Sequence, residues 1–131
     1  MAIIEWPWGK HAMGAFSVPA RLANPGRPEQ SLTIDLLVDT RATWTMLPGE
    51  IVGRLGLATS RQRLVTLASG ERVSYPAGQV AIQLNAEEII TIFLAGPAGS
   101  LTLLGAVTLE EFGLAPDPVR KTLIPVGGLL A

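Results

Sequence analysis

Hydrophobic and polar residues alternate along several stretches of the chain, which is the pattern of half-buried β-strands. The stretches that fit a strand pattern are residues 16–22, 32–38, 63–67, 72–75, 79–84 and 88–94. Turn-forming residues separate them, at positions 24–28, 68–71 and 85–86. Pro19 favours an edge position for the first strand, because proline cannot donate a backbone hydrogen bond to a neighbour. The pattern therefore predicts a mainly β chain built from hairpins.

Two short segments have helical spacing instead. The apolar residues within 51–55 recur at helical offsets, and Gly56 is suited to end that segment. A second helix is expected near residues 107–114. There Thr108 is a candidate N-cap, with Glu111 three residues later completing a capping box, and Gly113 ends the helix.

One carboxylate has an unusual position. Leu36, Leu37 and Val38 form a continuous apolar run, which predicts a strand that is buried on both faces. Asp39 follows directly and so emerges from the core, where an ionised acid is costly unless partners hold it. Asp39 is therefore a candidate functional residue. The alternative is that Asp39 caps a turn through its side chain, which is the usual role of an isolated Asp-Thr pair.

Composition limits the classes of function. The chain has 131 residues, which predicts one domain, and 48% of them are hydrophobic while 16% are charged. So apolar a composition indicates that a partner covers part of the surface. Ten basic and eleven acidic residues give no charge signature for binding nucleic acid or an anionic membrane.

The sequence lacks the residues for a zinc site, a disulfide or a membrane-spanning segment. The chain has no cysteine, and its one histidine, His11, cannot build a zinc site, so we expect no metal and no cofactor. The longest apolar run, at residues 89–95, is too short to cross a bilayer. The N-terminus lacks the features of a signal peptide, so a cytoplasmic location is expected. Trp6 and Trp8 lie in this N-terminal segment, where they either project loosely or pack on the body or a partner.

Two motifs resemble those of the retropepsin-like aspartic proteases. The family pattern of two hydrophobic residues followed by Asp-Thr-Gly-Ala-Ser/Thr matches residues 37–43, with one departure, Arg41 in place of glycine. The second hallmark, two hydrophobic residues and a glycine, matches Leu103, Leu104 and Gly105. The resemblance covers about residues 14–126.

The resemblance implies a fold and a set of site residues. The fold is an all-β, closed retropepsin-like barrel with one or two short helices, which forms dimers. Residues 1–13 are then an N-terminal extension, 14–126 the protease domain and 127–131 a C-terminal tail.

The resemblance also implies a set of site residues. The implied catalytic residues are Asp39 and Thr40. Supporting residues of the motifs are Ala42, Thr43, Leu103, Leu104 and Gly105, where the glycine lets two backbones approach closely. The implied flap over the substrate consists of Leu67, Ala68, Ser69, Gly70 and Glu71. The implied terminal strand, which interleaves with a partner, contains Val119, Leu123, Ile124, Pro125 and Val126.

Aspartic peptidases use two facing carboxylates that share one proton, so a single Asp-Thr motif is insufficient. Asp35 cannot supply the second acid, because four residues along a strand separate it from Asp39 by roughly 13 Å. We therefore expect a homodimer in which two copies of Asp39 meet at a two-fold axis. The matching threonine, Thr40, is expected to bond across that axis. The expected partners are a second copy and a peptide or protein substrate.

Arg41 leads to competing hypotheses. Its guanidinium occupies space that the family leaves for substrate, and at ~5 Å from Asp39 it would attract the carboxylate by about 3 kcal/mol. A positive φ at this position would add about 1 kcal/mol of strain. The first hypothesis is a homodimeric aspartic endopeptidase of reduced activity. The alternative is an inactive dimer that binds or scaffolds peptides, and the sequence is equally compatible with an arginine introduced to silence the site.

Overall fold

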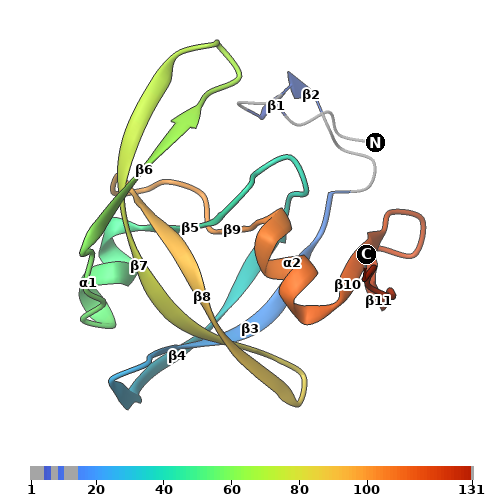
Figure 1. Cartoon of the computed structure of the whole chain (residues 1–131), viewed down its shortest axis with the longest axis horizontal. Helices are drawn as coiled ribbons and strands as arrows, with labels where there is room; N and C mark the ends of the chain where they lie inside the picture. The colour runs from blue at the N-terminus through green and yellow to red at the C-terminus, as the bar shows by residue number, and fades with distance from the viewer. Residues whose placement is uncertain (1–4, 7–8, 11–14, 131) are drawn as a thin grey trace.

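The computed structural model describes residues 5–6, 9–10 and 15–130 (Figure 1). Its strands are β1 (Glu5–Trp6), β2 (Gly9–Lys10), β3 (Ser17–Asn24), β4 (Arg27–Val38), β5 (Thr45–Pro48), β6 (Arg61–Thr66), β7 (Arg72–Leu84), β8 (Glu87–Gly96), β9 (Leu103–Leu104), β10 (Leu114–Asp117) and β11 (Thr122–Pro125). Its helices are α1 (Gly49–Arg54) and α2 (Ala106–Phe112). The all-β class with two short helices, predicted from the sequence, is confirmed. No helix among the described residues is long and apolar enough to cross a membrane.

Seven strands form one sheet that closes on itself. Their order is β3-β4-β9-β5-β8-β7-β6, and β3 also pairs with β7, so the strands from β3 to β7 form a ring. Pro19 lies in the part of β3 that pairs with β4, whereas the pairing with β7 involves residues 21–23. A proline at this position therefore removes no hydrogen bond from the β3–β7 ladder.

The ring encloses one hydrophobic core. Leucines from β3, β4, β5 and β9 meet valine, isoleucine and phenylalanine side chains from β7 and β8, and all are shielded from solvent. The fully buried residues of this set are Leu22, Leu36, Leu47, Val80, Ile82, Phe93 and Leu104. Of the apolar run before Asp39, Leu36 is fully buried, while Leu37 and Val38 are half-buried. The prediction of burial on both faces is therefore only partly correct.

The short strand β9 lies between β4 and β5. It runs parallel to β4, pairing Leu37 with Leu103, and antiparallel to β5, pairing Met46 with Leu103. Gly105 follows at once, and a Cβ atom there would lie 2.4 Å from the carbonyl carbon of Trp44. Only glycine fits, because the clashing atoms belong to the backbone. The close approach expected at Gly105 is confirmed.

The helix boundaries agree with the pattern, but one capping prediction is wrong. Gly113 ends α2 in the left-handed conformation, with φ 68°. Gly105, not Thr108, is the N-cap of α2, and no side chain caps that end. Thr108 is instead buried within the helix, where its hydroxyl bonds other threonines. Packing against β5 and β8 therefore determines the place of Thr108.

The chain ends in a separate hairpin in which β10 pairs with β11. Val119 lies in the turn of this hairpin and is 89% exposed, so its expected place in a strand is wrong. Ile124 and Val126 are also exposed, as are Leu129 and Leu130 beyond them. The described part of the C-terminus thus presents apolar side chains that the other described residues leave exposed.

Candidate active site

Asp39 lies where β4 leaves the core. Its side chain is 7% exposed, and its backbone N–H donates to the carbonyl oxygen of Leu104 at 3.1 Å. The preceding residue, Val38, pairs with Leu104 in the parallel ladder between β4 and β9. Two elements distant in sequence therefore fix the start of the loop that carries the acid.

The loop from Asp39 to Trp44 begins with a tight turn. The N–H of Ala42 donates to the carbonyl oxygen of Asp39 at 3.2 Å, and the N–H of Arg41 donates to the Asp39 carboxylate, at Oδ1, at 3.0 Å. Asp39 therefore also caps its own turn, as the alternative reading of the sequence expected. The two roles are compatible, because a carboxylate has two oxygens.

The rest of the loop is tied to the first turn of α2. The N–H of Ala106 donates to the carbonyl oxygen of Ala42 at 2.8 Å, and the N–H of Val107 donates to that of Thr43 at 2.9 Å. These bonds satisfy two amides that a helix N-terminus leaves without partners. Ala42, Thr43, Leu104 and the neighbouring Gly105, singled out from the motifs, therefore lie together behind Asp39.

Arg41 lies beside the acid. Its Nε atom is 3.6 Å from Oδ1 of Asp39, and its side chain is 45% exposed. The separation exceeds that of a charge-assisted hydrogen bond, so the side-chain contact is an ion pair between a buried carboxylate and a half-exposed guanidinium. The φ of Arg41 is negative, because the described residues other than glycine with positive φ are Asn85 and Lys121. The strain expected from a side chain at this position is therefore absent.

The β6–β7 hairpin projects from the body at the top of Figure 1. The N–H of Leu67 donates to the carbonyl oxygen of Glu71 at 2.7 Å, and Gly70 has φ 90°, so the tip at residues 67–71 has the predicted turn. The guanidinium of Arg63, on β6, lies 5.8 Å from the centre of the Trp44 ring. This contact brings the hairpin against the loop that carries Asp39.

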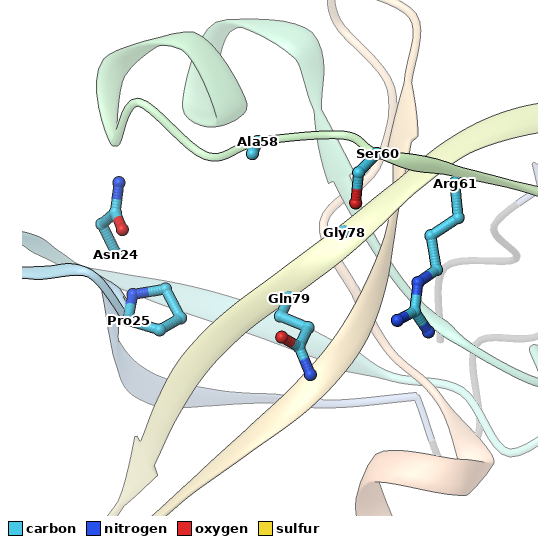
Figure 2. A pocket seen from close by; sticks show the side chains of 7 residues that line it. All are labelled: Asn24, Pro25, Ala58, Ser60, Arg61, Gly78 and Gln79. Atoms are coloured by element: carbon cyan, nitrogen blue, oxygen red, sulfur yellow. The ribbon is translucent and has the colours of Figure 1, made fainter.

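A surface hollow lies at the other end of the hairpin (Figure 2). It has a volume of about 180 Å³ and is lined by Asn24, Pro25, Ala58, Ser60, Arg61, Gly78 and Gln79. Asp39 does not line it. This hollow is therefore separate from the candidate active site.

No second acid is hydrogen-bonded to Asp39 within the described part of the chain. Asp35 is exposed and pairs across the sheet with Pro19. No group of three or more His, Cys, Asp or Glu residues among those described could hold a metal ion. The side chains of Trp6, Trp8 and His11 lie outside the described residues. The described residues thus provide one carboxylate where the chemistry of aspartic peptidases needs two.

Three buried threonines were missed by sequence reasoning. Thr45, Thr91 and Thr108 are each at most 3% exposed, and their hydroxyls hydrogen-bond one another behind the Asp39 loop. Nothing in the alternation of residues marks them, because threonine is equally common on exposed strand faces.

Comparison with solved structures identifies the fold. The retroviral protease-like domain of Ddi1 from Leishmania major aligns with a TM-score of 0.60 at 14% identity, over 88% of this chain and 90% of that one. The EIAV protease in complex with the inhibitor HBY-793 aligns with a TM-score of 0.55 at 20% identity, over 75% and 88%. A retropepsin-like aspartic protease from Rickettsia conorii aligns with a TM-score of 0.51 at 23% identity, over 83% and 88%.

The chain has the retropepsin fold. The resemblance drawn from the two sequence motifs is thereby confirmed at the level of the fold. In this chain, the closed barrel expected from the resemblance is the ring of strands from β3 to β7, and the two expected short helices are α1 and α2.

Sequence comparison gives a different set of relatives. The enterobactin exporters EntS of Salmonella typhi and Salmonella typhimurium are 31% identical to 98% of this chain, and that of Salmonella paratyphi A is 30% identical. The chain spans 31% of the length of these relatives. No family model matches the chain. The export of enterobactin is the named activity of those longer proteins.

Proposed function

We propose that this protein is an aspartic-type endopeptidase that acts as a homodimer. The observation that carries the proposal is Asp39, which is buried at the mouth of β4 on a loop held by β9 and α2 in a retropepsin fold. A carboxylate whose loop is anchored so firmly, and whose side-chain ion pairs among the described residues are limited to that with Arg41, is available for chemistry. The domain proposed for this reaction is residues 14–126, with 1–13 as an extension and 127–131 as a tail.

The second acid in this proposal is Asp39 of a second copy. A two-fold axis brings the same residue of both chains together, so one motif is sufficient. The exposed apolar side chains of the C-terminal hairpin, Ile124 and Val126, support association because such a surface is stabilised by being covered. Thr40, exposed next to Asp39, is proposed to bond across the axis.

The proposed chemistry is hydrolysis of a peptide bond by water. One Asp39 carboxylate accepts a proton from the water, and the other, protonated, donates to the carbonyl oxygen of the substrate. The hydroxide so formed adds to the carbonyl carbon, which gives a tetrahedral intermediate with two hydroxyl groups. The proton that the first carboxylate took is passed to the leaving nitrogen as the C–N bond breaks, and one hydroxyl of the intermediate returns a proton to the second carboxylate.

The β6–β7 hairpin is the proposed flap. Its tip, residues 67–71, is a hydrogen-bonded turn, and its β6 strand contacts the Asp39 loop through Arg63 and Trp44. A hairpin in this position closes over a bound peptide and excludes water from the reacting bond.

Arg41 supports a second candidate, an inactive dimer that binds or scaffolds peptides. A pair of acids that shares one proton needs one neutral carboxyl group. A guanidinium 3.6 Å from each carboxylate favours two charged ones. The same side chain also occupies space beside the acid that a substrate would use.

Peptide cleavage at mildly acidic pH tests the proposal. Cleavage by the wild type or by Arg41→Gly, abolished by Asp39→Asn and blocked by a statine-type inhibitor, is the expected result. Absence of cleavage in both the wild type and Arg41→Gly contradicts the proposal. Binding of the inhibitor without any cleavage supports the inactive dimer.

A further inference from the structure

One peptide group connects Asp39 to a buried chain of hydroxyls. The carbonyl oxygen of Leu104 accepts the N–H of Asp39 at 3.1 Å, and the N–H of the same peptide group, on Gly105, donates to Oγ1 of Thr45 at 3.1 Å. Gly105 donates the second bond and Thr45 accepts it, and both residues are buried. The Thr45 hydroxyl thus polarises the peptide group whose carbonyl oxygen holds the backbone of Asp39.

The chain continues to the surface of α2. Oγ1 of Thr45 lies 2.7 Å from that of Thr108, which lies 3.3 Å from that of Thr91. The hydroxyl of Thr91 donates to Oε1 of Glu111 at 2.5 Å. The three threonines come from β5, α2 and β8, so the chain crosses the core from one side of the sheet to the helix.

The direction of every bond follows from counting hydrogens. A threonine hydroxyl has one hydrogen, and that of Thr91 goes to the Glu111 carboxylate, which has none to give when ionised. Thr108 must therefore donate to Thr91, and its own oxygen must accept from Thr45. All the donors then point the same way, from the Asp39 amide towards Glu111.

We propose that Glu111 is a positioning residue for Asp39, acting through the hydroxyls of Thr45, Thr108 and Thr91. Hydrogen bonds aligned head to tail strengthen one another, by about 10–30% for each bond. A terminal acceptor on Glu111 orders the three hydroxyls, which strengthens the bond that fixes the backbone of the acid. The inference deepens the proposed peptidase function and rests on it for its effect on activity.

Glu111→Ala removes the terminal acceptor from an exposed position, so the variant is expected to fold. Glu111→Gln keeps an acceptor oxygen without the charge. Glu110→Ala is the matched control, because Glu110 is the exposed neighbour on α2 and its side chain makes no hydrogen bond among the described residues. Thr91→Val removes the last hydroxyl before Glu111 and is expected to act like Glu111→Ala, and Thr91→Ser, which restores the hydroxyl, is expected to act like the wild type.

The decisive readout is the amide proton signals of Asp39 and Gly105 in nuclear magnetic resonance spectra. Glu111→Ala is expected to move both signals towards those of weaker hydrogen bonds and to speed their exchange with solvent about three- to fivefold. Glu111→Gln and Glu110→Ala should leave them in place. In a peptide-cleavage assay, Glu111→Ala should lower kcat about three- to tenfold with KM unchanged.

A purely structural role predicts something else. If Glu111→Ala lowers the melting temperature while the Asp39 and Gly105 signals stay unchanged, the proposal is wrong. It is also wrong if Glu111→Gln behaves like Glu111→Ala, because the acceptor would then not be the cause. If no variant cleaves peptides, the proposed function fails, but the amide signals still test the hydrogen-bond chain.

Discussion

Replacing Arg41 by glycine should raise peptidase activity. The Nε of Arg41 lies 3.6 Å from Oδ1 of Asp39, and its side chain is 45% exposed. At this separation even a water-like dielectric gives an attraction of about 1 kcal/mol, and the burial of the carboxylate makes this a lower bound. A dimer whose two acids share one proton keeps only one of its two ion pairs, so the loss of the other disfavours this form by at least about 1 kcal/mol. Removing both guanidinium groups should therefore raise kcat/KM by roughly fivefold or more.

A second variant separates charge from bulk. Arg41→Met removes the charge but keeps a long side chain, whereas Arg41→Gly removes both. If the charge limits activity, both variants should cleave faster than the wild type. If the occupied space limits it, only the glycine variant should. Arg27→Met is the matched control, because Arg27 is an exposed arginine at the start of β4, twelve residues from Asp39 along the chain.

The assay is hydrolysis of a fluorogenic peptide library at mildly acidic pH, with each variant's melting temperature measured alongside. The negative φ of Arg41 means that glycine relieves no strain, so the melting temperature should stay the same or fall slightly. The reasoning is refuted if both Arg41 variants fold and neither cleaves faster than the wild type.

Three further predictions concern stability and assembly. Gly105→Ala should lower the free energy of unfolding by about 3 kcal/mol or more, because its Cβ would overlap the backbone, whereas Gly53→Ala, which meets nothing within 4 Å, should stabilise α1 by about 0.5–1 kcal/mol. Backbone N–H groups of Glu50 itself and of Gly99 lower the pKa of the Glu50 carboxyl. Its stabilising effect is therefore present above the pKa of the unfolded chain and is lost as the pH falls through the lowered folded pKa. Glu50→Gln should accordingly reduce the melting temperature at neutral pH and match the wild type in acid. Ile124→Asp should weaken self-association, as measured by analytical ultracentrifugation.

Each of these has an outcome that counts against it. Equal stabilities of Gly105→Ala and Gly53→Ala would mean that the loop adjusts freely around residue 105. A melting-temperature difference for Glu50→Gln that persists unchanged into acid would remove the charge from the explanation. An unaltered association constant for Ile124→Asp would exclude the C-terminal hairpin from the interface.

Much of the fold follows from local sequence. Alternation of residues predicts the hairpins, and glycine at positions 56, 70 and 113 marks turns where the φ angle is positive. Two short motifs were sufficient to relate the loop at Asp39 to β9, although more than sixty residues separate them. That relation came from a family resemblance, since no periodicity in one chain reveals a parallel pairing of two residues.

The errors share one physical cause. Thr108 has the spacing of a helix cap, yet tertiary packing places it in the core, where its hydroxyl bonds Thr45. Val119 is apolar in a C-terminal stretch of strand-forming residues, yet it lies in the β10–β11 turn. Local propensity is a weak guide wherever long-range contacts decide the position of a residue.

The central claim is that the acids of two chains form one active centre. The most direct test mixes wild-type chains, or Arg41→Gly chains if these cleave faster, with an equal amount of Asp39→Asn chains and lets the dimers exchange. If both acids are needed, only dimers with two intact copies cleave, and the rate per active chain added should fall to about one half, leaving about one quarter of all dimers active. A rate that depends only on the number of intact chains, and is indifferent to the added Asp39→Asn protein, would contradict the account.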